Sequence, residues 1–246
     1  MKILKKILIT GGAGFIGFHL ANRLIKNGCT VDIIDNLSRG KIDNDFKNLL
    51  KKKNLNFQNH DFLNNINIKK KDYNFIFHLA AIVGVKNVID KPFDVLEKNV
   101  KLLISILKFS LKQKKLKRFF FLSTSEVYAG SLKNKILKFP TNEKSILSLD
   151  SLDNKRSSYM LSKIYGEALC QFSKLPFTIL RPHNVYGQRM GMSHVIPELT
   201  KKVLKKNKFM TVYNPRHTRA FCFIDDAIEM IIKIMNSKKT LRKTYN

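Results

Sequence analysis

The sequence predicts an α/β fold built on a doubly wound parallel sheet. Short apolar runs rich in Ile, Val and Phe alternate with longer stretches of helical period as far as Arg181, which is the pattern of repeated βα units. The chain has 246 residues, 44% of them hydrophobic, and this length suits one large core. Apolar runs without polar alternation indicate strands buried on both faces.

The elements can be placed in order. Strands are expected at residues 6–10, 30–35, 55–59, 74–79, 118–123 and 177–181. Helices are expected at residues 14–27, 93–112, 157–173, 195–206 and 225–236. Because the pattern loosens after Arg181, the predicted domains are residues 1–181 and a smaller lobe of residues 182–246, some segments of which return to the main domain.

The charge is strongly positive, with 46 Lys and Arg against 18 Asp and Glu and a formal net charge of +28. Lysines occur in nearly every polar segment, whereas nucleic-acid binders usually add arginine forks. A compositional bias toward Lys, Asn and Ile is therefore favoured over a nucleic-acid surface. The field would still attract anionic substrates.

Three cysteines lie far apart without C-x-x-C spacing. They indicate neither a disulfide framework nor a zinc site, and they fit a reducing cytoplasm. No apolar run approaches the length of a membrane span. The expectation is a cytoplasmic protein that binds neither a membrane nor a metal.

The first strand leads into a glycine-rich turn at residues 10–17, T-G-G-A-G-F-I-G. Gly12, Gly14 and Gly17 match G-x-G-x-x-G, and Gly11 adds a further permissive position. Such a turn brings backbone N–H groups and a helix N-terminus against a pyrophosphate. Because the motif follows a strand and opens a helix, it predicts a Rossmann-type dinucleotide-binding domain.

Acidic residues follow the next two strands. Asp35 ends the second strand, where a carboxylate accepts both ribose hydroxyls of NAD. Arg39 would suit the 2′-phosphate of NADP, but Asp35 would repel that phosphate, so NAD is favoured. Asp61 follows the third strand and either hydrogen-bonds the adenine amine or caps a turn. His78 ends the fourth strand and is expected to be a packed histidine.

A second motif carries acid–base chemistry. Tyr159 and Lys163 are four residues apart, hence on one helix face. A tyrosine with an ordinary pKa of about 10 acts as a base only when a cation stabilises its phenolate, and Lys163 with the nicotinamide supplies that cation. Thr124 and Glu126 follow the fifth strand, at the sheet edge where ligands bind. Glu126 either performs acid–base work or caps the next segment.

These motifs, in this order, resemble the extended short-chain dehydrogenase/reductases, specifically the NAD-dependent epimerase/dehydratase group that acts on nucleotide-sugars. The resemblance covers essentially the whole chain. It is also carried by residues 78–81, H-L-A-A, by residues 181–187, R-P-H-N-V-Y-G, and by residues 218–226, T-R-A-F-C-F-I-D-D.

The resemblance implies a set of site residues. The implied catalytic residues are Thr124, Ser125, Glu126, Tyr159 and Lys163. The implied NAD-binding residues are Gly11, Gly14, Phe15, Ile16, Gly17, Asp35, Asn36, Asp61, Phe62, Leu79, Ala80, Ala81, Asn99, Tyr159 and Lys163. The implied substrate-binding residues are Val83, Asn184 and Arg219, of which the last two hold the diphosphate of a nucleotide-diphosphate sugar. A homodimer is also implied.

The implied mechanism begins when Tyr159 takes the proton of the sugar C4 hydroxyl as the C4 hydride moves to NAD. Three outcomes of the 4-keto intermediate stay open: 4-epimerisation, loss of water and decarboxylation. The triplet from Thr124 to Glu126 resembles UDP-glucuronate decarboxylases and GDP-mannose 4,6-dehydratases more than galactose epimerases. The alternative to a lyase or isomerase is a catalytically impaired NAD-binding protein of the same fold.

Two features depart from the family pattern. Residues 214–217, N-P-R-H, replace the usual Gly-rich turn before Thr218. The sequence ends at Asn246, where relatives continue for several tens of residues. The expectation is a small, truncated C-terminal substrate lobe, in a fragment or a short natural variant.

Overall fold

The computed structural model describes residues 4–64, 72–205, 209, 211–212 and 215–246. In these residues the main sheet has seven strands, all parallel, in the order β3-β2-β1-β4-β5-β6-β9. The strands are β1 (Lys6–Thr10), β2 (Thr30–Asp35), β3 (Leu55–Asn59), β4 (Phe75–His78), β5 (Arg118–Leu122), β6 (Phe177–Leu180) and β9 (Thr244–Tyr245). The order reverses between β1 and β4, which is the switch point where ligands bind in such sheets.

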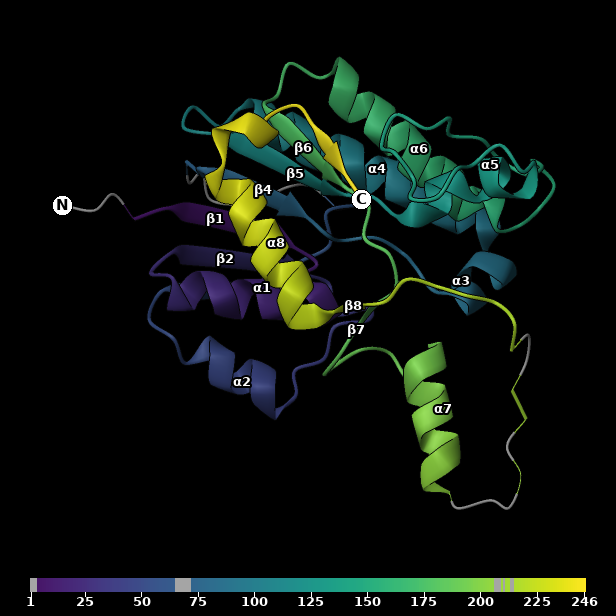
Figure 1. Cartoon of the computed structure of the whole chain (residues 1–246). Coiled ribbons are helices and arrows are strands. Elements are labelled where there is room, and N and C mark those ends of the chain that lie inside the picture. Colours follow the sequence, from purple (N-terminus) through teal and green to yellow (C-terminus); the bar gives the residue numbers. More distant parts are fainter. Residues whose placement is uncertain (1–3, 65–71, 206–208, 210, 213–214) are drawn as a thin grey trace.

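Helices cover both faces of the sheet (Figure 1). The helices α1 (Phe15–Lys26) and α8 (Ile224–Asn236) contact each other on one face, with α2 (Asn44–Leu50) beside them. The helices α4 (Pro92–Leu111) and α6 (Ser157–Phe172) pack together on the other face. Shorter elements lie in the connections: α3 (Val85–Asp90), η1 (Ser125–Tyr128), α5 (Ala129–Lys133) and η2 (Lys238–Thr240).

Two hydrophobic clusters, one on each face, hold these layers together. Ile7 and Ile9 of β1 belong to the cluster with α1 and α8, whereas Leu8 belongs to the cluster with α4 and α6. All three are fully buried, as alternation along a strand covered on both sides requires. Phe77 and Phe120 are register partners in β4 and β5, and their rings stack with centroids 4.3 Å apart. The expected burial of the strands on both faces is confirmed.

The expected strands and helices are confirmed to within two residues at each end. Lys206, the predicted last residue of α7 (Val195–Leu204), lies outside the described residues, as does Asn214. The sequence did not predict the short elements, such as α2 and α3, because they offer too few turns for a hydrophobic period. One signal for α2 was available: Asp43 is its N-cap and accepts a hydrogen bond of 3.0 Å from Phe46 N.

The C-terminal part is divided between two places. The strands β7 (Val185–Tyr186) and β8 (Cys222–Phe223) pair in a separate parallel sheet, and α7 stands away from the main sheet with no buried residue (Figure 1). In contrast, α8 packs on α1, and β9 pairs with β6 at the sheet edge. The residues after Arg181 therefore form both the β7–β8 region and part of the main layers.

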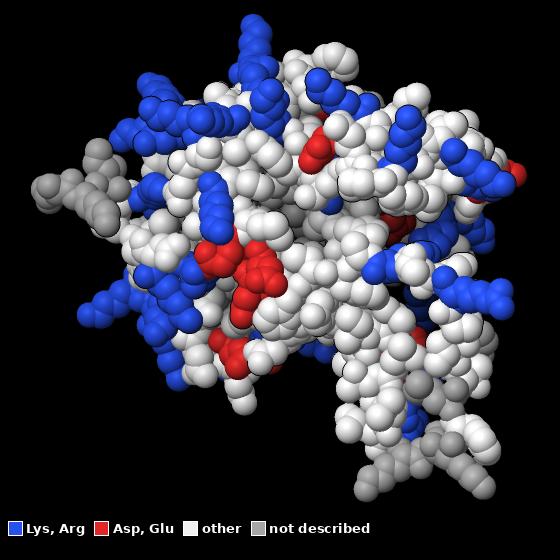
Figure 2. Space-filling view, in the orientation of Figure 1, with Lys and Arg blue, Asp and Glu red and all other residues white. Residues whose placement is uncertain are grey.

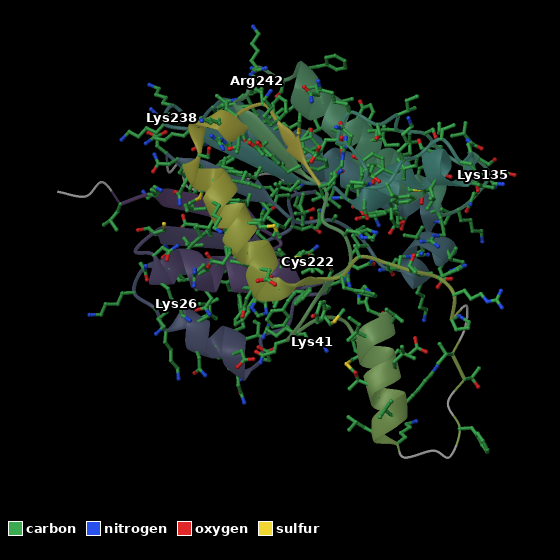
Figure 3. All side chains as sticks on the ribbon, viewed as in Figure 1. Lys26, Lys41, Lys135, Cys222, Lys238 and Arg242 are labelled. Atoms are coloured by element: carbon green, nitrogen blue, oxygen red, sulfur yellow. The ribbon has the colours of Figure 1, made fainter. Side chains whose placement is uncertain are left out.

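Basic residues are spread over the surface. Figure 2 shows Lys and Arg distributed over the visible face, which carries no single basic patch. Lys26, Lys135 and Lys238 project from separate parts of the molecule in Figure 3. Among the described residues, no helix is long and apolar enough to cross a membrane, and no cluster of three or more His, Cys, Asp or Glu could hold a metal.

Candidate active site

The glycine-rich turn between β1 and α1 is packed too tightly for side chains. Gly11 has a φ of +73°, and a Cβ there would lie 2.7 Å from the Ala80 nitrogen. A Cβ at Gly17 would lie 2.4 Å from the Gly11 oxygen. Gly12 instead faces the core, where a Cβ would lie 2.6 Å from Ile33. The positions that keep this turn tight are thus Gly11 and Gly17, and the turn fits the pyrophosphate cradle of a dinucleotide.

Asp35 lies at the end of β2, beside this turn, and is 9% exposed. Its Oδ2 accepts a hydrogen bond of 3.0 Å from Ala13 N, and its Oδ1 accepts one of 2.8 Å from Leu37 N. Burial raises the pKa of this carboxyl, and the backbone hydrogen bonds oppose that rise. Each carboxylate oxygen has further acceptor capacity, so the site fits ribose hydroxyls.

The other residues expected around the adenosine lie near Asp35. Asn36 Nδ2 donates to Asp61 Oδ2 at 2.9 Å, and Asp61 Oδ1 accepts from Leu63 N at 2.9 Å. Asp61 therefore caps a turn, which was one of its two predicted roles; contact with adenine stays a prediction. Phe62 is buried in the cluster with α4 and α6, and the half-buried Phe15 and Ile16 open α1.

The segment after β4 is fixed by side chains from its neighbours. His78 is buried as predicted, its Nδ1 lies 2.8 Å from Thr10 Oγ1, and burial lowers its pKa to about 3. Asn99 of α4 binds the backbone of Ile82 twice, accepting from the nitrogen at 2.7 Å and donating to the oxygen at 3.0 Å. Asn99 also donates to Ser162 Oγ of α6 at 3.4 Å. It thereby links the segment after β4, where the cofactor is expected, to the helix that carries Tyr159.

The segment after β4 includes the half-buried residues Leu79, Ala80 and Ala81. Val83, the expected substrate contact, follows them, and its carbonyl accepts a hydrogen bond of 3.0 Å from Asn87 Nδ2. This segment leads into α3. Contact of Val83 with the substrate stays a prediction.

The helix α6 presents Tyr159 and Lys163 to the end of β5. Lys163 Nζ donates a hydrogen bond of 2.7 Å to the Leu122 carbonyl and lies 5.7 Å from the centroid of the Tyr159 ring. Lys163 is 6% exposed, and burial lowers its pKa to about 8. Burial, and then the Glu126 charge, raise the pKa of the Tyr159 phenol, whereas a hydrogen bond with Thr124 lowers it. Thr124, Glu126, Tyr159 and Lys163 therefore lie together in the structure, and their catalytic roles stay predictions.

Glu126 has a partner that the sequence interpretation missed. Its Oε2 lies 3.4 Å from Arg156 Nη2, and its side chain is 42% exposed. Thr124 Oγ1 accepts from Glu126 N at 3.2 Å and so caps η1, in which Ser125 is the first residue. Arg156 precedes Tyr159 by three residues and is the N-cap of α6, and no local sequence signal pairs it with Glu126.

The residues expected to hold the nucleotide meet through the β7–β8 pair. Asn184 Nδ2 donates to the Ala220 oxygen at 3.0 Å, and Cys222 N donates to the Asn184 oxygen at 3.3 Å. Arg219 is exposed and donates to the Thr218 oxygen at 2.7 Å. The Asn184 amide is thus engaged with backbone, whereas the neighbouring Arg219 guanidinium reaches solvent.

The comparison with known families decides the family of this chain. The NAD dependent epimerase/dehydratase family matches residues 7–246. The chain belongs to this family. Its cofactor is NAD, which the packed glycine turn and the Asp35 carboxylate described above fit.

Relatives within the family carry out different reactions. The chain is 33% identical to a UDP-N-acetyl-alpha-D-glucosaminuronate decarboxylase of Bacillus cytotoxicus over 250 residues, which are 95% of this chain and 72% of that protein. It is 33% identical to a dTDP-D-glucose 4,6-dehydratase of Dictyostelium discoideum over 261 residues, covering 99% of this chain and 58% of that protein.

Solved family members share the fold. A UDP-glucose 4-epimerase of Thermotoga maritima with UDP-glucose matches with a TM-score of 0.80 and 27% identity, over 98% of this chain and 76% of that one. A UDP-glucuronic acid 4-epimerase from Bacillus cereus, in complex with UDP-glucuronic acid and NAD, matches with a TM-score of 0.76 and 29% identity over the same shares. The chain spans about three quarters of both structures.

Proposed function

We propose that the protein oxidises C4 of a nucleotide-linked sugar with NAD and then acts on C5 and C6 of the 4-keto sugar, as a lyase. The observation that carries this proposal is the place of Glu126. Thr124 hydrogen-bonds the Tyr159 phenol, and the nearby Glu126 carboxylate lies close enough for its charge to raise the pKa of that phenol. A carboxylate at that place suits a reaction with a second proton transfer. NAD, when bound, takes up the C4 hydride.

In this proposal Tyr159 receives the proton of the C4 hydroxyl. The Lys163 ammonium favours the phenolate electrostatically, and the Thr124 hydroxyl aligns the phenol and the substrate hydroxyl. Low exposure of Lys163 strengthens its effect on the phenolate, since buried charges are screened less than exposed ones. These three residues serve the first oxidation in every branch of the family chemistry.

Glu126 separates the branches. Removal of water or of a carboxylate requires a proton to be moved at C5 or C6, and a partly exposed carboxylic acid can exchange protons with solvent between turnovers. Arg156 neutralises Glu126 at 3.4 Å and would also attract a substrate carboxylate. The similarity to the decarboxylase and the dehydratase supports this lyase proposal.

A 4-epimerase is the second candidate. It needs only rotation of the ketone and return of the hydride, and the 42% exposure of Glu126 and its pairing with Arg156 are also those of a surface carboxylate with no chemical role. Similarity to solved 4-epimerases supports this candidate.

The test is to incubate the purified protein and NAD with UDP-glucuronate, UDP-glucose, GDP-mannose and dTDP-glucose, and to identify products by mass. Loss of carbon dioxide or water is the expected result. A product of unchanged mass with inverted C4 would assign the epimerase instead. Tyr159→Phe serves as the control for contaminating enzymes.

For the substrate diphosphate, we propose Arg219 as the principal ligand. Its guanidinium is exposed beside Asn184 and can present paired donors to phosphate oxygens. Asn184 contributes by holding the Ala220 backbone, and hence the Arg219 segment, in place. The expected result is that Arg219→Ala raises KM for the nucleotide-sugar and leaves NAD affinity unchanged.

We also propose a homodimer built on α4 and α6. These helices pack together, and both carry exposed apolar side chains: Phe93 (73%), Leu111 (54%), Tyr165 (44%) and Phe172 (87%). Apolar side chains exposed on both helices would be buried if this two-helix face packed against the same face of a second chain. Light scattering of the purified protein should give twice the chain mass, and a monomer at micromolar concentration would refute the proposal.

A further inference from the structure

A buried ion pair lies behind the catalytic lysine. Glu167 follows Lys163 by about one helical turn on α6, and its two oxygens accept from Arg181, Oε1 from Nε at 2.9 Å and Oε2 from Nη2 at 2.5 Å. The Arg181 and Glu167 side chains are only 5% and 7% exposed. This is the bidentate geometry in which arginine fixes a carboxylate most firmly.

The end of β5 holds both charged residues of α6. The Leu122 carbonyl accepts from Lys163 Nζ at 2.7 Å, and Ser123 Oγ donates to Glu167 Oε1 at 2.5 Å. The last residue of β5 and the residue after it thus fix two side chains that lie one turn apart on the helix. The ammonium and the carboxylate keep their spacing because both are bonded to the same strand end.

Among the groups of the described residues, the Glu167 carboxylate has the largest electrostatic effect on Lys163. Burial lowers its pKa, whereas the Glu167 carboxylate raises it. His78 faces it from β4, and burial lowers the pKa of this histidine to about 3, so it is neutral near pH 7. Cys170 faces it from α6, and burial raises the pKa of the thiol, so it is neutral too. Arg181, at the end of β6, is neutralised by Glu167 itself.

The two glutamates act on different partners. The Glu126 charge raises the pKa of Tyr159, whereas the Glu167 charge raises that of Lys163. Glu167 is about two helical turns from Tyr159, or roughly 12 Å along the axis. Removing the Glu167 charge should therefore affect the phenol through the ammonium.

We propose that the Glu167–Arg181 pair positions the catalytic centre: Glu167 keeps the buried Lys163 charged and correctly placed beside Tyr159. A buried ion pair is weak evidence for stability, because two apolar residues of similar volume often stabilise a fold as well. An electrostatic role toward Lys163 explains why a carboxylate occupies this place. The inference rests on the proposed role of Tyr159 as the base, and Glu167 is a positioning residue that touches no reacting atom.

The test compares Glu167→Gln with the unaltered protein, each with NAD bound, by following phenolate absorbance against pH. The titration of Tyr159→Phe, subtracted from each, leaves the ionisation of Tyr159. Glu167→Gln keeps the side-chain size but removes the charge. The positive nicotinamide of bound NAD lowers the pKa of the phenol into the range where Lys163 is charged. Loss of that Lys163 charge should then raise the phenol pKa by about one unit or more, which means about tenfold less phenolate at neutral pH and a similar loss of kcat.

Two matched variants separate charge from packing. Glu167→Asp keeps the charge and should restore most of the titration midpoint. Ser123→Ala removes one hydrogen bond to Glu167 but no charge, so its midpoint should stay within about a third of a pH unit of the unaltered protein. If Glu167→Gln fails to fold, Glu167→Gln with Arg181→Met removes both buried charges and is titrated instead.

The inference is overturned if a folded Glu167→Gln protein, or the double variant, ionises Tyr159 as the unaltered protein does. A Glu167→Asp protein that behaves like Glu167→Gln would equally overturn it, since the charge would then be irrelevant. Failure of the proposed function appears differently, as absence of turnover in the unaltered protein with every nucleotide-sugar. The titration decides the inference in either case, because it requires no substrate.

Discussion

Lys163 Nζ donates a hydrogen bond of 2.7 Å to the carbonyl oxygen of Leu122. The acceptor is a backbone carbonyl at the end of β5, so the hydrogen bond that holds the ammonium comes from the sheet. From there the ammonium lies 5.7 Å from the centre of the Tyr159 ring. The distance between the ammonium and the phenol therefore depends on how β5 and α6 pack.

Tyr159→Phe should abolish turnover and leave folding and NAD binding nearly unchanged. In the proposed function the phenol oxygen is needed only to receive the C4 proton, and the ring that remains maintains packing. NAD affinity by calorimetry and turnover by product mass check both parts. Lys163→Met is the comparison and should weaken NAD binding as well. Residual turnover above about 10% of normal would assign the base to another group.

Asp35→Ala should weaken NAD binding by about tenfold or more, because a carboxylate that accepts two ribose hydroxyls is lost. The unaltered protein should strongly prefer NAD to NADP, since Asp35 would repel a 2′-phosphate. Arg39→Ala provides the control, and its preference should be the same. Equal affinity for both cofactors in the unaltered protein would make Arg39 the deciding residue.

Glu126→Gln distinguishes the lyase from the epimerase. In a lyase the first oxidation should proceed, visible as NADH absorbance, and the following step should slow by roughly 100-fold to 10,000-fold, the usual contribution of a positioned acid or base. Arg156→Gln is the companion variant, which keeps the carboxylate and removes only its partner. Normal conversion by the Glu126→Gln protein would favour epimerisation.

His78 should make the protein less stable in mild acid. In the unfolded chain a histidine binds a proton below pH about 6.5, whereas burial lowers the pKa of folded His78 to about 3. The unfolded state therefore binds more protons between these values, and the free energy of unfolding falls as pH falls through this window, by at most about 5 kcal/mol. Urea denaturation at several pH values measures the slope.

The control for His78 is a pair of variants. His78→Gln should flatten the dependence of stability on pH, although it should lower stability at pH 7 through the lost contact with Thr10. His217→Gln, at an exposed position, should leave the slope as it is. A His78→Gln protein with an unchanged slope would mean that other groups cause the acid sensitivity.

Local sequence signals determined the layers of the fold and the chemistry of its motifs. Apolar runs predicted the strands of four or more residues, because burial on two faces removes polar residues from a strand. The helical period of the polar and apolar residues predicted the long helices. The turn from Gly11 to Gly17 and the spacing of Tyr159 and Lys163 can be recognised from residues within one turn or one helix, although the structure adds a distant constraint on Gly11 from Ala80. Such features can be predicted from sequence because the residues that form each motif lie close together in the chain.

Tertiary structure alone decided the contacts between distant residues. Glu167 meets Arg181, Asn99 holds Ile82, and Asn184 binds the Ala220 backbone, because strand order and helix packing bring these segments together. Arg156 beside Glu126 is set in the same way, by η1 approaching the start of α6. Nothing in the local period of either segment records such a partner, since each pairing is a property of the closed sheet and its helices.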